Sequence, residues 1–451
     1  MNKRKQLSDS VKTVGKRIIM FNLMVVVIGL ICTFLNFLYV DGGANTWPRV
    51  VMHNFYEQDK NIDTLFLGSS HVFWNINPYI LDELTGENNF NLATNGQRVS
   101  ASYYLLREAD KVNDIKQVFV ELYYDFAVED GENAHTECIT QWYCLDNMKW
   151  SANKIRYMYN VIEQTQYLET LLPFMRYRSK LFDNEHIQKQ IRVKLTNDYK
   201  EYKGEEKHER GKISYTDKGY TYSDIYADEW QCALKTEFRM EDHPLSEESK
   251  LYIKKIIEYC ADNNIRLAFF SAPLYELQMM ALGDYDLYVK QIKELLAPYN
   301  IDYFDFNLVK EEYLSIDDIK YFADYEHLNS DGAEIFTNCI NKIFFDEMVY
   351  SEEYFHDTYT DKLQKSTGKV FGIYYIEDLE NGKEKWVVAS NRRDEMQYRI
   401  YMTPDSGETV MLQDFNSNPY IEIDKNENGI LSIVYRTVGD EERISTKEVY
   451  Y

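Results

Sequence analysis

Residues 64–71 read Thr-Leu-Phe-Leu-Gly-Ser-Ser-His, an apolar run that ends at a glycine and is followed by two serines. The run predicts a buried β-strand, and the glycine predicts a turn after which a helix begins at Ser70. A serine hydroxyl is a weak nucleophile until a base removes its proton. If Ser70 is a nucleophile, the chain must therefore supply a histidine that is held by a carboxylate.

Asp324 and His327 supply such a pair within residues 322–333. They are three residues apart, so one helical turn or a tight loop places both side chains on one side, where the carboxylate can orient the imidazole. A serine after a strand is, taken alone, more often a helix cap. The combination predicts a triad in the chain order Ser70, Asp324, His327.

Strand-like and helix-like segments alternate through the middle of the chain. Further strands are expected at 90–94, 118–122, 265–270 and 301–306, and helices at 78–84, 100–112, 246–260, 287–296 and after His327. This alternation is typical of an α/β domain whose largely parallel sheet is covered on both faces. Such sheets carry their sites at the carboxyl ends of the strands, where Ser70, Gly96 and Tyr123 fall.

Residues 125–243 interrupt the alternation and are predicted to be an insertion in a domain that spans 62–350. An insertion after the third strand lies near the mouth of the site. Its aromatic residues Trp142, Tyr143 and Trp150 either belong to a core or stack on sugar rings.

Residues 18–40 contain no charged side chain and are long enough to cross a bilayer core of about 30 Å as a helix. Residues 1–17 form a basic tail, so the positive-inside rule places the N-terminus in the cytoplasm and the rest of the chain outside the cell membrane. A cleaved signal peptide is the main alternative, although its apolar core is normally shorter. A buried core helix is the third.

Residues 41–61 are predicted to be a connector in which Gly42-Gly43 and Trp47-Pro48 break regular structure, with Trp47 at the membrane interface. Residues 366–451 contain short alternating runs separated by turn sequences, which predict a small β-sandwich.

Composition excludes several classes of function. A net charge of −24 argues against a nucleic acid partner, because phosphate binding needs a basic surface. Cys138 and Cys144 could form a disulfide or remain as buried thiols. The eight histidines are scattered and no metal-ligand motif or phosphate-binding glycine loop is present, so neither a metal nor another cofactor is expected.

Three stretches resemble the SGNH/GDSL hydrolase superfamily, within it a membrane-anchored branch that includes the D-alanyl transfer protein of the teichoic-acid pathway and alginate-acetylation proteins. They are Gly-Ser-Ser-His at 68–71, Asn-Leu-Ala-Thr-Asn-Gly-Gln at 91–97, and Asp-x-x-His-Leu-Asn-x-x-Gly-Ala at 324–333. The resemblance implies a flavodoxin-like three-layer sandwich. It also implies Ser70 as nucleophile and the backbone N–H groups of Ser70 and Gly96 as the oxyanion hole.

The family's remaining block departs from the pattern. Ordinary members have Gly-x-Asn-Asp where this chain reads Glu-Leu-Tyr-Tyr-Asp at 121–125, so the oxyanion asparagine is missing. Loss of one such donor can cost about 100-fold or more in rate. His71, Asn91 and Gln97 are candidate substrate-binding residues, although for His71 a role in supporting the loop is favoured, because a neighbour in sequence is poorly placed to act as base for Ser70.

The leading hypothesis is an outward-facing O-acyltransferase or esterase that acts on acyl esters of a cell-surface polysaccharide. By resemblance, its partner is a membrane-bound acyltransferase. The alternatives are a glycan deacetylase that uses water as acceptor and a catalytically inactive glycan-binding surface protein.

Overall fold

Five parallel strands form the central sheet of the protein, in the order β2-β1-β3-β8-β9. The computed structural model describes residues 2–43, 46–128, 134–228, 232–236, 238–347, 351–405 and 407–451. The strands are β1 (Thr64–Leu67), β2 (Asn89–Asn91), β3 (Gln117–Glu121), β8 (Arg266–Ser271) and β9 (Tyr303–Asp305). This is the strand order of the flavodoxin-like fold, so the predicted three-layer α/β architecture is confirmed.

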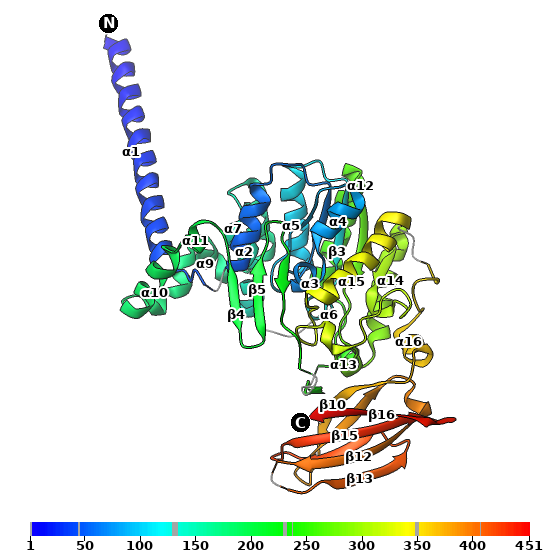
Figure 1. Ribbon diagram of the computed structural model, residues 1–451. Coiled ribbons are helices and arrows are strands. Elements are labelled where there is room, and N and C mark those ends of the chain that lie inside the picture. The colour runs from blue at the N-terminus through cyan, green and yellow to red at the C-terminus, as the bar shows by residue number, and fades with distance from the viewer. Residues whose placement is uncertain are drawn as a thin grey trace.

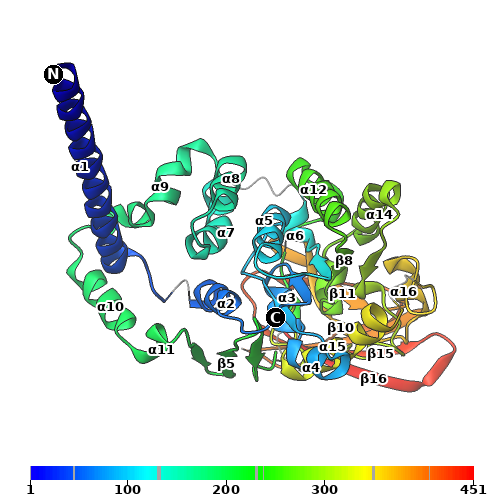
Figure 2. The same cartoon turned by 90° about the horizontal axis from the view of Figure 1, so that it is seen from above.

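Helices cover both faces of this sheet (Figures 1 and 2). One layer contains α5 (Val99–Asp110), α12 (Glu247–Asn263) and α14 (Tyr285–Leu296), and the other contains α4 (Pro78–Thr85) and α15 (Ser330–Ile340). Apart from the first residues of β8, the strands are buried because each lies between the two layers, which explains the apolar runs of β1, β3 and β8.

Local sequence signals fix the helix ends beside β1. Asn77 caps α4 by accepting from the N–H of Tyr79, Pro78 occupies the first turn, and Gly86 ends the helix with a φ of +73°. Glycine adopts this left-handed conformation without a steric penalty. These signals return the chain to the sheet edge at β2, so that β1 and β2 end side by side.

The N-terminal helix α1 (Asn2–Tyr39) stands apart from the α/β domain (Figure 1). Its segment Val14–Tyr39 is long and apolar enough to cross a membrane, and its side chains are largely exposed. Lys194 Nζ donates hydrogen bonds to the carbonyls of Asn36 (3.0 Å) and Phe37 (2.8 Å), and His186 Nε2 donates to that of Tyr39 (2.8 Å). Three carbonyls of the last helical turn thereby accept hydrogen bonds from the side chains of His186 and Lys194.

His186 and Lys194 lie in α10 (Asn184–Lys194), within the predicted insertion. Its helices form an arc between α1 and the α/β domain (Figure 2). They are α6 (Tyr124–Ala127), α7 (Ala134–Asn147), α8 (Ala152–Val161), α9 (Tyr167–Leu171), α10 and α11 (Asn197–Lys200), and they are followed by the three-stranded sheet of β4 (Glu205–His208), β5 (Gly211–Tyr215) and β6 (Thr221–Ser223).

The prediction for the segment after α1 is wrong in two respects. Regular structure is not broken at Trp47-Pro48, because α2 runs from Thr46 to Tyr56 and a proline is tolerated in the first turn of a helix. Trp47 does not lie at a membrane interface. Only 4% of it is exposed, and its Nε1–H donates to the carbonyl of Ala93 (3.2 Å).

Cys138 and Cys144 both lie in α7, and no disulfide joins these two described residues. The Cys144 sulfur is buried and lies 3.4 Å from Thr94 Oγ1. Burial raises the pKa of this thiol to about 11, so it is protonated at neutral pH.

The C-terminal part forms two four-stranded sheets, in the orders β14-β11-β10-β7 and β13-β12-β15-β16. The strands are β7 (Ala233–Leu234), β10 (Val370–Asp378), β11 (Lys383–Ser390), β12 (Met396–Pro404), β13 (Val410–Asn416), β14 (Tyr420–Asp424), β15 (Gly429–Thr437) and β16 (Asp440–Tyr450). The predicted β-sandwich is confirmed. The sequence did not indicate β16, or that β7 of the insertion pairs in parallel with β10.

Candidate active site

Ser70 is the first residue of the short helix α3 (Ser70–Asn75), which follows β1 after two residues. Ser69 is the N-cap, and its side chain accepts a hydrogen bond from the N–H of His71. The N–H groups of a first helical turn have no carbonyl partner within the helix. The backbone N–H of Ser70 is therefore placed beside its own hydroxyl and is not used by the helix.

Gly68 is required where β1 passes β3. A Cβ atom at this position would lie 2.5 Å from both Cβ and Oε2 of Glu121 and 2.6 Å from Val72 Cγ2. These distances are shorter than any ordinary carbon contact. The glycine therefore lets the Glu121 carboxylate reach the start of α3.

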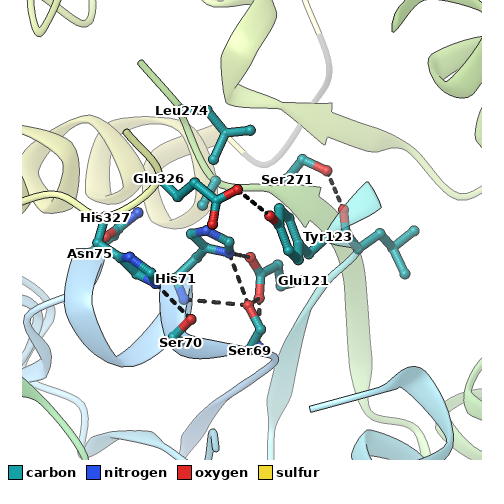
Figure 3. Close-up of polar contacts among 12 residues, drawn as sticks. Ser69, Ser70, His71, Asn75, Glu121, Tyr123, Ser271, Leu274, Glu326 and His327 are labelled. Carbon is teal, nitrogen blue, oxygen red and sulfur yellow. Dashed lines mark hydrogen bonds and ion pairs between the residues drawn. The ribbon is translucent and has the colours of Figure 1, made fainter. Parts of the chain in front are cut away.

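His327 joins Ser70 to Asp324 (Figure 3 shows the Ser70 contact). His327 Nε2 lies 2.7 Å from Ser70 Oγ, and Nδ1 lies 3.0 and 2.9 Å from the two carboxylate oxygens of Asp324. Asp324 and His327 lie in a tight loop that is closed by the isolated β-bridge between Phe322 and Leu328, and not in a helical turn. The structure thus brings together the three side chains that the sequence predicted as a triad.

The Asp324 carboxylate is also bound by its own loop. Its Oδ1 accepts from the backbone N–H groups of Glu326 and His327, both at 2.8 Å. The Asp324 side chain is 55% exposed, and its partial desolvation raises its pKa. The charge and hydrogen bond of His327, together with the two N–H groups, outweigh this effect and lower the pKa of Asp324 to about 2. Asp324 is therefore ionised throughout the physiological range and can orient His327 Nδ1–H.

Three further hydrogen bonds fix the loop against the rest of the site. The buried Asn75, at the end of α3, accepts from the N–H of Leu328 at 3.0 Å. Glu326 Oε1 accepts from the Tyr123 hydroxyl at 2.7 Å and from Gln278 Nε2 at 3.3 Å. Burial, together with the nearby Tyr124 and Glu326, raises the pKa of Tyr123 well above its usual value, so its hydroxyl remains a donor.

A second set of polar side chains lies beside the nucleophile (Figure 3). His71 is 1% exposed, and its Nδ1 lies 3.0 Å from Glu121 Oε1 and 2.9 Å from Ser69 Oγ. Glu121 Oε2 also accepts from the N–H (2.6 Å) and the hydroxyl (2.8 Å) of Ser69. These contacts hold residues 69–71 on the end of β3.

The environment of His71 favours its charged form. Burial lowers the pKa of His71, but the charge and hydrogen bond of Glu121 outweigh burial and raise this pKa above its usual value. A buried imidazole at 1% exposure does not reach solvent, so the structure places His71 in the support of the loop. Its candidate role in binding substrate directly is not supported by this position.

In the second predicted stretch, residues 91–97, Asn95 is exposed and the other six residues are buried. Gly96 lies in the turn between β2 and α5 with a φ of +60°, and a Cβ there would lie 2.7 Å from Thr140 Cγ2. Asn91 is fully buried and donates to the carbonyls of Val72 (3.3 Å) and Ile76 (2.8 Å), the second of which is the C-cap residue of α3.

Gln97 is also buried, and its Nε2 donates to the carbonyl of Leu92 (3.3 Å) and to Ser102 Oγ (3.1 Å). The amide nitrogens of Asn91 and Gln97 thus donate to partners inside the fold, and Asn91 Oδ1 is buried there as well. The structure does not bring either side chain to the Ser70 surface, and this corrects their candidacy as substrate-binding residues.

The three aromatic residues singled out in the insertion have different surroundings. Trp142 is buried and donates from Nε1 to Thr170 Oγ1 at 2.8 Å, so it belongs to the core. Trp150 is 67% exposed and has the Lys154 amine over its ring. Tyr143 is half-buried and lines a cavity beside α3.

Sequence reasoning missed the roles of Glu121, Asn75 and Glu326. Glu121 had a signal, because it is the one charged residue in the apolar run Val-Phe-Val-Glu-Leu of β3. The others had none, because Asn75 and Glu326 act through partners far away in the chain. Within the described parts of the chain, no three His, Cys, Asp or Glu side chains gather as metal ligands.

No protein-family model matches this chain, and no curated protein matches it either. Among solved structures, the chain is similar to a protein of Bacteroides fragilis NCTC 9343 described as a "putative acylhydrolase", with 10% sequence identity and a TM-score of 0.31. The alignment covers 67% of this chain and 96% of that chain. The flavodoxin-like fold follows from the strand order β2-β1-β3-β8-β9, and the candidate site is defined by the contacts among Ser70, His327 and Asp324.

Proposed function

We propose that the protein is a membrane-anchored serine O-acyltransferase or esterase of the SGNH type, which acts on acyl esters of a cell-surface glycan. The observation that carries this proposal is the continuous contact from Ser70 Oγ through His327 to Asp324. This is the arrangement that converts a serine hydroxyl into a nucleophile.

In the proposed reaction, Ser70 Oγ attacks the carbonyl carbon of the donor ester and its proton moves to His327 Nε2. Asp324 holds the resulting imidazolium through Nδ1–H. The N–H groups of Ser70 and Gly96 stabilise the tetrahedral oxyanion. The leaving oxygen takes the proton from His327, which leaves an acyl ester on Ser70. An acceptor hydroxyl then attacks this ester and passes its proton to His327. The bond between Ser70 Oγ and the acyl carbon breaks, Ser70 Oγ takes the proton back from His327, and the new ester departs.

The oxyanion hole of the proposed enzyme contains no asparagine side chain. Tyr123 lies next to the position of the missing residue, but its hydroxyl donates to Glu326 and its ring packs against His71 at 4.3 Å between centroids. Two backbone donors stabilise the oxyanion less than three donors. This favours transfer from an activated acyl donor over hydrolysis of ordinary esters.

The proposed location follows from the apolar segment 18–40 and from the basic residues of the tail 1–17 that precedes it. With the N-terminus in the cytoplasm, the site faces outward, and the acyl group is supplied by a membrane-bound acyltransferase that carries it across the bilayer. Protease added to intact cells should digest the chain from the C-terminal side and leave a fragment that contains α1. Full protection of the chain would contradict this orientation.

The function is tested by the acyl ester content of the cell-envelope glycan, measured as acid released by mild alkali. Cells that express wild-type protein are compared with cells that express Ser70→Ala. A transferase predicts less ester in the variant, whereas a deacetylase predicts more. Equal ester content in both strains would contradict both enzymatic functions and favour an inactive glycan-binding protein.

A further inference from the structure

Two of the six residues of α3 are not buried, and these are Ser70 and Trp74. They are one helical turn apart and therefore lie on the same face of the helix. Both contact His327, Ser70 through its hydroxyl and Trp74 through its ring, whose centroid lies 5.2 Å from that of the imidazole. The surface beyond Trp74 is thus the direct continuation of the catalytic surface.

A cavity of about 180 Å³ opens there, with Trp74 in its wall. This volume is below the 300–1,000 Å³ typical of pockets for drug-sized ligands, so the cavity suits one small group. Its floor is apolar: the buried Trp47 packs against the buried Phe73 at 4.7 Å and against the half-buried Tyr215, which extends to the rim, at 5.0 Å between ring centroids. The floor is therefore aromatic.

The rim of the cavity is different, because it combines rings with hydrogen-bonding groups. Trp74, Tyr143 and Tyr215 are half-buried, whereas Asn95 and Glu206 are exposed. Among the described residues that line the cavity, Glu206 has the one charged side chain, and it accepts from the Tyr215 hydroxyl at 2.9 Å. The charge at this rim is negative, as is the net charge of −24 of the chain.

We infer that this cavity is the acceptor subsite of the proposed enzyme and that it binds one uncharged sugar ring. A pyranose presents C–H groups on its faces and hydroxyls around its edge, so it needs aromatic surfaces next to an amide and a carboxylate. An alkyl chain would desolvate Glu206 and Asn95 without replacing their hydrogen bonds. A phosphate or uronate group would be repelled by Glu206.

This assignment rests on the proposed function and specifies the group that receives the acyl ester, a hydroxyl of the bound sugar. A ring held against Trp74 lies one side chain away from His327, so a hydroxyl of this ring or of its neighbour can reach the acyl ester on Ser70. The insertion supplies Tyr143, Glu206 and Tyr215, and the segment after the membrane helix supplies Trp47. The insertion therefore contributes specificity for the acceptor, while the α/β domain supplies the chemistry.

The test uses full-length protein in detergent with 4-nitrophenyl acetate as donor. Three neutral tetrasaccharides of gluco, galacto and manno configuration serve as acceptors, beside a tetragalacturonate and 1-octanol. The ratio of acetylated acceptor to free acetate is measured by mass spectrometry. We expect transfer to at least one neutral tetrasaccharide, and little transfer to the uronate or the alcohol.

Tyr143→Ala and Glu206→Gln should lower this ratio at least tenfold, and Tyr143→Phe, which keeps the ring, should retain most of it. Trp150→Ala removes another exposed aromatic residue of the insertion and should leave the ratio unchanged. The inference would be overturned if the ratio were equal in all variants. It would also be overturned if octanol or the uronate were the preferred acceptor and this preference depended on Tyr143. Absence of any nitrophenol burst in the wild type would instead refute the proposed function, and the inference would fall with it.

Discussion

The imidazole ring of His71 stacks on that of His327, with 4.9 Å between the ring centroids and 16° between the planes. The two rings have different partners. His71 is buried and held by Glu121, whereas His327 is held by Asp324 and contacts Ser70. Different carboxylates thus bind the two neighbouring histidines: His71 supports the nucleophile loop, whereas His327 is the base of the proposed reaction.

Replacement of Asp324 by asparagine should lower kcat strongly while the fold persists. The amide keeps the size of the carboxylate, but it can no longer stabilise the imidazolium or fix the required tautomer of His327. We expect a loss of about 10³–10⁴-fold in kcat on 4-nitrophenyl acetate. Asp331→Asn, at an exposed site in the first turn of α15, serves as a matched control. A loss below tenfold in Asp324→Asn would contradict the orienting role.

The Glu121–His71 pair should make stability depend on pH above neutrality. The pKa of His71 is raised in the folded protein, so its contribution is fully present below the unfolded value of about 6.5 and is lost as pH rises through the folded pKa. The urea midpoint of the wild type should therefore fall above pH 6.5. In Glu121→Gln this decline should be smaller, because the carboxylate that raises the pKa is absent.

Glu209→Gln, at an exposed site, is the control for that measurement and should follow the wild type. If Glu121→Gln showed the same decline as the wild type, the charged pair would not be the source of the pH dependence.

A methyl group at position 68 should disturb the site and the fold together. In Gly68→Ala the new Cβ would meet Glu121 and Val72 at 2.5–2.6 Å, so β1 or β3 must shift. Overpacking of this kind typically costs about 1–3 kcal/mol in the free energy of unfolding. Gly407→Ala is the control, because its nearest neighbour would lie 3.8 Å away. Equal thermal stability of the two variants would show that Gly68 is not needed for the close approach.

Removal of the Tyr123 hydroxyl should loosen the loop that contains His327. Tyr123→Phe leaves Glu326 without its shortest hydrogen bond, and a bond to a charged group contributes about 1.5–3 kcal/mol. The free energy of unfolding measured in urea should fall by this amount, and the activity should decrease as well. Tyr299→Phe, whose ring is 38% exposed, should have little effect on either measurement. No change in Tyr123→Phe would indicate that Glu326 does not fix the loop.

The sequence predicted the central sheet and the triad because both leave short-range signals. Apolar runs mark β1, β3 and β8, and Asp324 and His327 are close in the chain. It could not predict the positions of Asn91 and Gln97, which resemble a surface motif but bond to backbone carbonyls inside the fold. It also misplaced Trp47, because an aromatic residue near a membrane helix has the same sequence signature whether it meets lipid or a protein core.

The measurement that tests the central claim most directly is labelling of the full-length protein in detergent with a fluorophosphonate probe, followed by peptide mapping. The account predicts one adduct, on Ser70, which is absent from Ser70→Ala and strongly reduced in His327→Ala. No adduct in the wild type, an adduct on Ser69, or undiminished labelling of His327→Ala would contradict the claim that His327 and Asp324 activate Ser70.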